Sequence, residues 1–334
     1  MKRQGYLFEE ICSFENLLKA AKKAQRGKRF KKSTAVFNLE LERELLFIQD
    51  KLKSGTYQMG AYRHFFVFDP KRRFISAAPY FDRVVQHALC NVIEPIFEKS
   101  FIYDSYACRK EKGTHKAVDR FTEFARRTVY VLKCDVRNYF ASIDHDVLFQ
   151  MIQRKIKDPK VLWLIGVILD STPNPDIPIG NLTSQIFANL YLNGLDHFIK
   201  EELKCRFYLR YMDDLILFGD KKTELTERKE AIARHLESVK LTLHQKKSQI
   251  YQTRSGVPFL GYKVYPTHRL VVTQNICRFR RRTKKFMRLL LMKVISGEKI
   301  AASIQSWLGY AGHADSHHLC KTLLSELAMK GISP

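Results

Sequence analysis

The spacing of apolar residues divides the chain into helix-like and strand-like stretches. Residues 8–56 have a helical pattern, which the basic run KKAQRGKRFKK interrupts. The segment YRHFFVFDPKRRFISAA then alternates strand-forming residues around Asp69-Pro70. It predicts a hairpin whose tip carries Lys71, Arg72 and Arg73. Residues 82–101 return to helical spacing.

In the second half of the chain, acidic residues follow apolar strands. The run TVYVLKCDV predicts a buried strand that ends in an acid, Asp135. The loop STPNPDIPIGN precedes a helix expected over 182–199. A charged helix is expected over 222–239, short strands near 249–265, and a helical tail from Thr273 onward. Asp144 is expected to cap a helix that begins near His145.

The run RYMDDLILFGD sets two acids, Asp213 and Asp214, inside an apolar stretch. Neighbouring side chains of a continuous strand point to opposite faces, so one carboxylate would face the core. The conflict disappears if residues 212–214 form the tight bend of a hairpin, because both carboxylates then project the same way. A solvated turn is the alternative interpretation, since aspartate is common in turns.

Composition narrows the class of partner. With 58 lysines and arginines against 34 aspartates and glutamates, the formal charge is +24, which suits a polyanion. A basic membrane-surface protein is the competing class, but no apolar run reaches about 18 residues, and MKRQGYLFEE lacks the apolar core of a signal peptide. The seven cysteines are scattered and form no C-x-x-C pair, so we expect them to be reduced thiols. We expect a cytoplasmic protein.

A carboxylate at the end of a strand can meet the carboxylates of a neighbouring hairpin, so Asp135, Asp213 and Asp214 are expected to converge. Hard oxygen ligands suit Mg²⁺, and they suit Mn²⁺ as well. Two such ions about 3.5 to 4 Å apart activate an attacking hydroxyl and stabilise a leaving pyrophosphate. The pattern indicates nucleotidyl transfer, with a cap or turn role for Asp135 as the alternative.

Ordered blocks between residues 62 and 265 resemble those of the reverse transcriptases. The blocks KRRFISAAPYFDRVVQHAL and SYACRKEKGTHKAV resemble the fingers region and the block after it, and CDVRNYFASIDH and RYMDDLILF resemble the two catalytic blocks. PIGNLTSQIFANLYLN is similar to the substrate-positioning loop and helix, and LHQKKSQI and FLGYKVY to the blocks before the thumb. The resemblance implies an RNA-directed DNA polymerase with an α+β, right-hand architecture: fingers, a palm with an antiparallel sheet, and a helical thumb.

The resemblance also implies domains and site residues. An N-terminal helical extension is expected over 1–60, fingers over 61–128, a palm with inserted fingers helices over 129–265, and a thumb over 266–334. The expected catalytic residues and ligands of two Mg²⁺ ions are Asp135, Asp213 and Asp214. The expected dNTP-binding residues are Arg72, Arg73, Phe140, Ile179, Gly180, Gln185 and Lys247. About 70 residues follow FLGYKVY, so no added endonuclease, integrase or ribonuclease H domain is expected.

Each of these roles has a physical reason and a plainer alternative. Phe140 would crowd a ribose 2′-hydroxyl, or it is a core aromatic. Arg72 and Arg73 would bind triphosphate oxygens, or they are solvated at a hairpin tip. Gly180 would let the backbone approach a base pair, or it serves a turn. Lys247 would protonate the leaving pyrophosphate, or it is a surface lysine.

Ile179 stands where many reverse transcriptases carry glutamine ahead of the glycine. An amide there could hydrogen-bond near the incoming sugar, whereas isoleucine offers apolar contact alone. Loss of a polar contact made in the correctly paired geometry lowers discrimination by about 1 to 3 kcal/mol. The alternative is that Ile179 fills a small apolar gap.

The tail opens with RFRRRTKKFMR, in which Phe279 and Phe286 interleave with basic residues. This arrangement puts apolar anchors on one helix face and phosphate contacts on another. A merely solvated face is the alternative. We expect a template–primer track formed by Arg278, Arg280, Arg281, Arg282, Lys284 and Lys285.

The block IGNLTSQ carries Ser184-Gln185 where intron-encoded and many other bacterial enzymes show Ser-Pro. Within the group II intron-like superfamily, this resembles the reverse transcriptases of diversity-generating retroelements. The resemblance implies cDNA synthesis from a repeat RNA in a bacterial cell, errors at template adenines, and a small basic accessory variability protein as partner. The alternatives are a retron, intron-type or phage-defence reverse transcriptase of ordinary fidelity, and a non-catalytic RNA-binding protein of polymerase shape.

Overall fold

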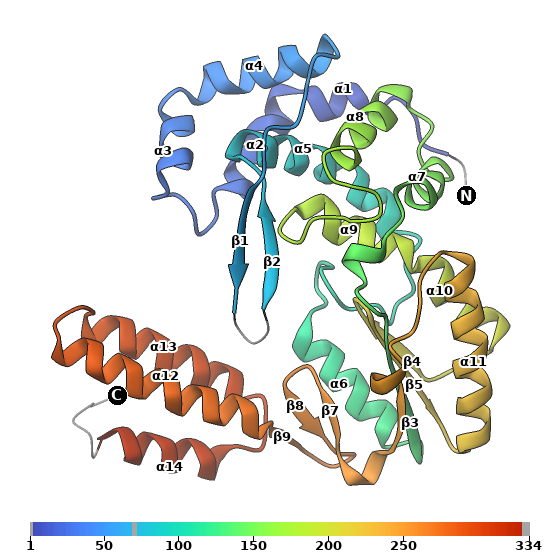
Figure 1. Ribbon diagram of the computed structural model, residues 1–334, viewed down its shortest axis with the longest axis vertical. Coiled ribbons are helices and arrows are strands. Elements are labelled where there is room, and N and C mark those ends of the chain that lie inside the picture. Colours follow the sequence, from blue (N-terminus) through green and yellow to red (C-terminus); the bar gives the residue numbers. More distant parts are fainter. Residues whose placement is uncertain (1–2, 69–71, 329–334) are drawn as a thin grey trace.

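The computed structural model describes residues 3–68 and 72–328. Figure 1 shows a helical N-terminal part with a projecting hairpin, a central sheet flanked by helices, and a C-terminal group of helices. Helices and antiparallel strands both contribute, as expected of an α+β protein. No helix in the described residues is both long and apolar enough to cross a membrane.

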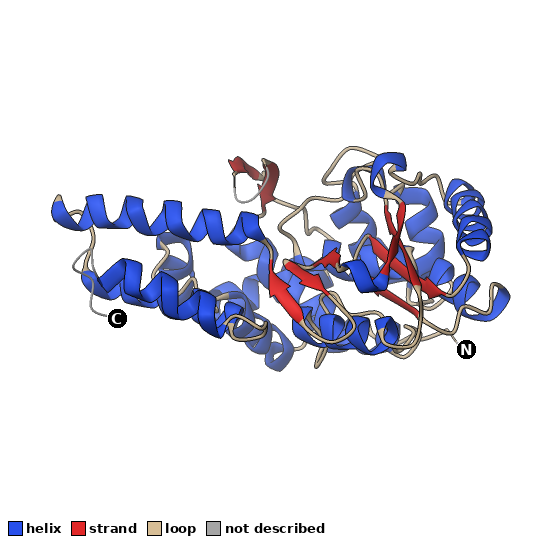
Figure 2. Ribbon diagram, turned by 90° about the horizontal axis from the view of Figure 1, so that it is seen from below, coloured by secondary structure: helices blue, strands red, loops and turns tan. Residues whose placement is uncertain are grey.

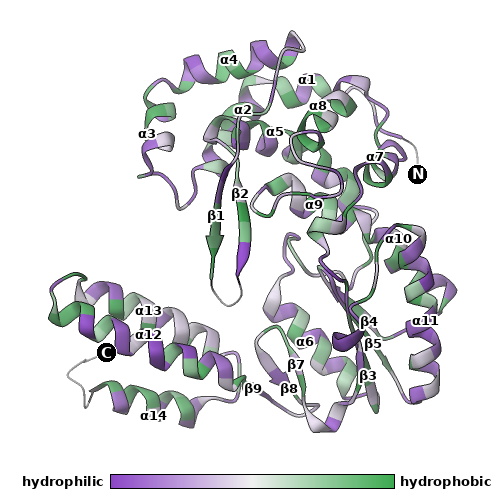
Figure 3. Ribbon diagram, in the orientation of Figure 1, coloured by the Kyte–Doolittle hydropathy of each residue, from purple (hydrophilic) through white to green (hydrophobic). Residues whose placement is uncertain are grey.

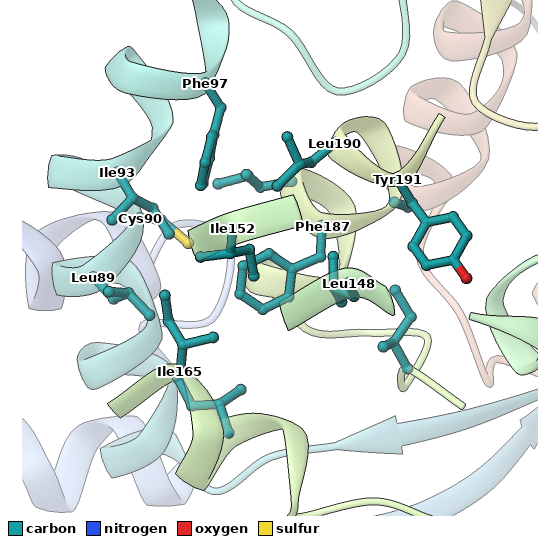
Figure 4. Packing of buried hydrophobic residues seen from close by; sticks show 14 of the residues in the cluster. Leu89, Cys90, Ile93, Phe97, Leu148, Ile152, Ile165, Phe187, Leu190 and Tyr191 are labelled. Carbon is teal, nitrogen blue, oxygen red and sulfur yellow. The ribbon is translucent and has the colours of Figure 1, made fainter. Parts of the chain in front are cut away.

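Four helices at the N-terminus pack around the long helix α5 (Tyr80–Glu98). They are α1 (Phe8–Cys12), α2 (Phe14–Ala24), α3 (Lys32–Leu39) and α4 (Leu41–Lys53). Ser13 begins α2 as an N-cap, since its hydroxyl accepts from the amide of Asn16 at 3.2 Å. The apolar faces of these helices join the largest core, in which Leu89, Cys90 and Ile93 of α5 face Phe187 and Ile152 (Figure 4).

The predicted hairpin is confirmed as an isolated two-stranded ribbon. Strand β1 (Arg63–Val67) pairs antiparallel with β2 (Arg73–Ala77), from Arg63 opposite Ala77 to Val67 opposite Arg73. Every residue of β1 is exposed, whereas β2 changes from exposed at Arg73 and Phe74 to buried at Ser76, so the ribbon is covered only near its base. Figures 1 and 2 show it projecting from the body. Asp69, Pro70 and Lys71 of the predicted tip lie outside the described residues.

A four-stranded antiparallel sheet with the order β4-β5-β3-β6 forms the centre of the molecule. Its strands are β3 (Tyr130–Asp135), β4 (Tyr208–Tyr211), β5 (Asp214–Gly219) and β6 (Gln249–Gln252). Leu132 and Leu217 face the core shared with α5, and Val131 and Phe218 face a second core. Because both faces are covered, the strands read as continuous apolar runs instead of alternating ones.

The helices of this region pack against strands of the sheet or against one another and α5. They are α6 (Thr114–Ala125), α7 (His145–Gln153), α8 (Pro159–Leu169), α9 (Leu182–Tyr191), α10 (Asn193–His197) and α11 (Lys222–Ser238). Asp144 caps α7 as predicted, accepting from the amide of Val147 at 3.0 Å. The single helix predicted over 182–199 is wrong: α9 stops at Tyr191, α10 starts at Asn193, and a wide π turn follows at Phe198–Glu202. Asn193 and Gly194, at the break, are weak helix formers.

The C-terminal part starts with a small antiparallel sheet of β7 (Val257–Phe259), β8 (Tyr262–Val264) and β9 (Arg269–Val271). Helices α12 (Thr273–Leu291), α13 (Gly297–Ala311) and α14 (His317–Ala328) follow and share a third core. In this core, the rings of Phe279 and Trp307 stack with centroids 4.2 Å apart. Figure 3 shows α12 alternating hydrophilic and hydrophobic stretches, as an amphipathic helix does.

Candidate active site

The three predicted aspartates meet at one end of the central sheet. Asp135, the last residue of β3, pairs directly with Asp214, the first residue of β5. Directly opposed residues of antiparallel strands project to the same face, so these two carboxylates are neighbours. Asp213 lies in the turn between β4 and β5, where Met212 adopts a left-handed φ of 56°. The predicted bend at 212–214 is therefore present.

Charge is concentrated at this turn. Burial and, after it, the nearby carboxylates of Asp214 and Asp135 together raise the pKa of Asp213 to about 6. Burial and Asp135 also raise the pKa of Asp214, against the opposing effect of Lys133, whose Nζ is 3.4 Å away. Lys247 donates to Asp135 with Nζ 2.8 Å from Oδ1. Two lysines thus offset part of the repulsion among three acids.

In residues 3–68 and 72–328, no group of three His, Cys, Asp or Glu side chains is gathered tightly enough to hold a metal ion as it stands. The donor chemistry nevertheless fits a divalent cation. Three carboxylates supply hard oxygen ligands, and the mutual repulsion that raises the pKa of Asp213 is what a bound cation relieves. Asp135, Asp213 and Asp214 are the residues that would hold it, with Lys133 and Lys247 released from their ion pairs.

Phe140 lies just beyond Asp135, in a short 3₁₀ turn at Phe140–Ser142. Its ring is partly buried, 5.7 Å between centroids from the ring of Tyr139, whose hydroxyl donates to the carbonyl of Ala188 on α9. The Phe140 carbonyl accepts from the amide of Ile177 at 3.1 Å. The turn that carries Phe140 is therefore tied to the loop that carries Ile179 and Gly180.

That loop also contacts the base of the hairpin. The carbonyl of Ile179 accepts from the amide of Ser76 on β2 at 3.2 Å. Gly180 has φ 130°, and a Cβ there would lie 3.1 Å from the Ser76 carbonyl oxygen, which is tighter than side chains normally tolerate. Approach of β2 is thus sufficient reason for a glycine. Gln185 is half-buried on α9.

The predicted phosphate-binding arginines of the hairpin are not gathered at the aspartates. Arg72 and Arg73 are exposed on the projecting ribbon (Figure 2). The guanidinium of Arg72 stands 4.0 Å from the centroid of the Phe66 ring, a cation–π distance. The hairpin places two cations at its tip, within a row of exposed aromatic side chains that includes Phe68 and Phe74.

The basic residues of α12 form a separate group. All six predicted members are exposed: Arg278, Arg280, Arg281, Arg282, Lys284 and Lys285. A pocket of about 430 Å³ is lined by Trp307, Tyr310 and three of these arginines: Arg278, Arg281 and Arg282. Arg280 instead pairs with Glu326 of α14 at 2.7 Å. The anchoring predicted for Phe279 and Phe286 is confirmed, since Phe279 is buried and Phe286 packs against the same core.

Sequence reasoning missed two cations next to the aspartates. Lys133 is the single basic residue in the apolar run TVYVLKCDV, and Arg210 is the single basic residue in RYMDDLILF. Arg210 is fully buried, and its side chain binds Asp196 on α10 at 2.8 Å. A charge in an otherwise apolar strand is itself an anomaly, and this signal could have identified both residues.

A central antiparallel sheet that brings three acids together beside an aromatic residue, with helices on both sides, defines the palm of a template-directed nucleic-acid polymerase. The reverse transcriptase (RNA-dependent DNA polymerase) family matches residues 68–264, which is more than half of the chain. The chain belongs to this family and is an RNA-directed DNA polymerase. Reverse transcriptase domains use divalent metal ions, which agrees with the donor set.

Relatives span the bacterial and intron-encoded branches. Protein YkfC of Escherichia coli is 27% identical over 270 residues, covering 66% of this chain and 71% of YkfC. Group II intron-encoded protein LtrA of Lactococcus lactis is 28% identical over 178 residues, covering 50% of this chain and 30% of LtrA. An uncharacterised 91 kDa protein in a cob intron of Schizosaccharomyces pombe is 36% identical over 136 residues, covering 38% of this chain. The match spans only 17% of that yeast protein.

Among solved structures, an apo telomerase of Candida tropicalis, truncated from its C-terminal domain, aligns with 64% of this chain and 55% of that chain. The sequence identity is 15% and the TM-score is 0.48.

Proposed function

We propose that this chain extends a DNA strand on an RNA template by two-metal nucleotidyl transfer, with Asp135, Asp213 and Asp214 holding two Mg²⁺ ions. The observation that carries the proposal is the pairing of Asp135 with Asp214 across two strands, with Asp213 beside them at a raised pKa of about 6. Mn²⁺ would serve in place of Mg²⁺, because it accepts the same oxygen ligands. Two divalent ions held by these carboxylates would supply activation of the 3′-hydroxyl and stabilisation of the departing pyrophosphate.

Side chains around the aspartates bind and select the nucleotide. Phe140 presents an aromatic ring beside the sugar, where it leaves no room for a 2′-hydroxyl. Lys247, whose Nζ lies 2.8 Å from Oδ1 of Asp135, would hold the proton that the leaving pyrophosphate takes up. Arg72 and Arg73 bind triphosphate oxygens when the hairpin approaches the palm. Gln185 and Gly180 border the same site.

At a finer level, we infer that the enzyme belongs to a diversity-generating retroelement and makes error-prone, adenine-mutagenic cDNA from a template-repeat RNA. The block IGNLTSQ, with Ser184-Gln185, supports this branch. Ile179 fits this inference, because isoleucine offers apolar contact alone where many reverse transcriptases carry glutamine. The proposed setting is the cytoplasm of a bacterial host, and the proposed partner is a small basic accessory variability protein.

Deep sequencing of cDNA from the purified chain tests the proposal. The protein copies a defined RNA, with and without a co-encoded small basic protein, and the Asp213→Asn variant serves as the background control. Errors concentrated at template adenines support the mutagenic retroelement enzyme. Accurate cDNA selects a reverse transcriptase of ordinary fidelity, and absence of cDNA above the control contradicts the proposed activity.

An intron-type reverse transcriptase of ordinary fidelity is the second candidate. The observation that favours it is the identity shared with LtrA and with the protein in the yeast cob intron. Retron and phage-defence enzymes belong to the same class of outcome, since each makes accurate cDNA. The error spectrum separates the two classes. An accurate enzyme gives a uniform, low error rate at all four template bases, whereas the mutagenic enzyme gives errors concentrated at adenines.

A further inference from the structure

We propose that Arg210 is the positioning residue of the catalytic turn. Its buried guanidinium binds the carbonyl of Met212 and ties the turn that carries Asp213 and Asp214 to helices α9 and α10. The inference rests on the proposed nucleotidyl transfer at these aspartates, which it deepens by naming what holds them in place.

The guanidinium of Arg210 is fully enclosed, and each of its five N–H groups has an acceptor. Nε and Nη2 bind the carboxylate of Asp196, with distances of 2.8 Å to each oxygen. Nη1 donates to Oδ1 of Asn189 at 3.1 Å and to the carbonyl of Met212 at 3.0 Å. Nη2 also reaches the carbonyl of Asn189 at 3.3 Å.

The contact with Met212 bears directly on the aspartates. The Met212 carbonyl belongs to the peptide unit that joins this residue to Asp213, so holding it fixes the plane from which Asp213 projects. Met212 has a left-handed φ of 56°, an unfavourable conformation for a residue with a side chain. Such a conformation persists when surrounding contacts hold it, and the Arg210 bond is one of these contacts.

The other end of the tether is anchored as well. The amide of Arg210 donates to the Asp104 carbonyl and its carbonyl accepts from the Tyr106 amide, both at 2.9 Å. Asn189 donates to the carbonyl of Ala107 at 2.8 Å, which links α9 to the same loop. These bonds fix the position of the turn relative to the loop at 104–107, to α9 and to α10.

Stability alone does not account for this arrangement. A buried ion pair costs desolvation free energy, and apolar residues of similar volume often serve a fold equally well. Arg210 and Asp196 are both completely buried. The pair lies next to the turn, and one N–H of Arg210 donates to the turn backbone. An apolar pair would form no such directional bond. A directional hydrogen bond restrains the orientation of the peptide group that accepts it, whereas apolar packing leaves that orientation less specified.

The test compares Arg210→Lys with Arg109→Lys. Lysine keeps the charge but loses the fork that reaches several acceptors at once. Arg109 is a matched control, since it is nearly buried, binds Glu98 with two nitrogens, and donates to two carbonyls, Ile102 and Ser105, outside the turn. Both full-length variants are measured for unfolding temperature, amide hydrogen exchange without metal, and steady-state DNA synthesis.

Relative to the control, Arg210→Lys is expected to speed amide exchange in peptides covering 208–219. It is also expected to lower kcat about tenfold or more, to raise the Mg²⁺ concentration for half-maximal activity several-fold, and to leave KM for dNTP within about twofold, since small misplacements at a reacting centre are costly. The proposal is overturned if exchange at the turn and the Mg²⁺ requirement match wild type. It is equally overturned if both variants lose activity in proportion to their folded fraction, which is the behaviour of a purely structural pair.

If Arg210→Lys does not fold, Asn189→Ala replaces it, because that change removes one acceptor of Arg210 and leaves the Asp196 pair in place. A smaller change of the same two readouts supports the proposal, and wild-type values overturn it. The exchange comparison needs no activity. A wild-type protein that makes no DNA would therefore defeat the proposed function, while the tether to Met212 would still be tested by exchange.

Discussion

The palm and helix α12 use charge in opposite ways. In the palm, three acids lie half-buried beside one another, burial raises the pKa of Asp213 and Asp214, and Lys133 and Lys247 form ion pairs with Asp214 and Asp135. On α12, six cations are exposed, and in the described part of the chain Arg280 is the one of them that forms an ion pair. A metal-dependent reaction needs a few groups held within a fraction of an ångström. Binding a polyanion needs many accessible charges that displace counterions.

This contrast predicts that palm substitutions change chemistry while binding survives, and that α12 substitutions change salt-dependent binding while chemistry survives. The largest effect is expected for Asp213→Asn. It removes a metal ligand and should lower Mg²⁺-dependent DNA synthesis by at least about a hundredfold, with RNA affinity nearly unchanged. Primer extension and filter binding measure the two quantities. Activity within tenfold of wild type would contradict the metal role.

The same variant has a stability signature. The pKa of Asp213 is raised from its ordinary 3.8 to about 6 in the folded protein, so ionisation opposes folding above about pH 4 and does so fully above about pH 6. Without metal at pH 7.5, Asp213→Asn is expected to unfold at the same or a higher temperature than wild type. The difference should vanish near pH 4. A clear loss of stability at pH 7.5 would show that the fold needs the carboxylate of Asp213, so that this residue would not serve chemistry alone.

The next largest effect is expected for Phe140→Val. A smaller side chain opens space beside the sugar, and the preference for dNTP over rNTP should fall by about 10- to 100-fold, the range of one steric contact. The ratio of kcat/KM values for the two nucleotides measures it. Tyr139→Phe is the matched control, since Tyr139 is buried next to Phe140 and faces α9. An unchanged preference in Phe140→Val would make Phe140 a core residue.

Ile179→Gln tests whether the loop beside the palm aspartates affects fidelity. If the apolar loop loosens discrimination, an amide should lower misincorporation opposite template adenine more than opposite the other three bases. The gain corresponds to about 1 to 3 kcal/mol at most, with total cDNA yield changed less than fidelity. Sequenced cDNA from both proteins at matched yield provides the comparison. Indistinguishable error spectra would assign Ile179 to gap filling.

The smallest effect is expected on α12. Replacing Arg281 and Arg282 by Ala should reduce the slope of log affinity against log salt by about 1.4 to 1.8, since each phosphate contact contributes roughly 0.7 to 0.9. Arg280→Ala is the internal control, because Arg280 already pairs with Glu326 and should change the slope less. RNA binding over a salt series measures the slopes. A double variant with the wild-type slope would show that the helix presents a solvated face.

Sequence reasoning predicted the parts of this molecule that depend on local rules. The pairing of β1 with β2, the Asp144 cap and the Asp-Asp bend follow from strand alternation, capping and turn chemistry, each of which acts within a few residues. The helix expected over 182–199 was wrong, because apolar spacing cannot register a backbone break between Tyr191 and Asn193. Arg210 and Lys133 were missed because their partners, Asp196 and Asp214, are set by the packing of separate elements.

The sequence by itself determined which residues have the chemistry for this reaction: three carboxylates at strand ends, an aromatic near the first of them, and a surplus of cations suited to nucleic acid. The tertiary structure alone decided which residues lie beside them. It set Lys247 on Asp135, brought the Phe140 turn to the loop of Ile179, and placed Arg210 beneath Met212. The physical reason is range. Propensity and periodicity act over a few positions of the chain, whereas ion pairs and pKa shifts depend on atoms a few ångströms apart that belong to distant segments.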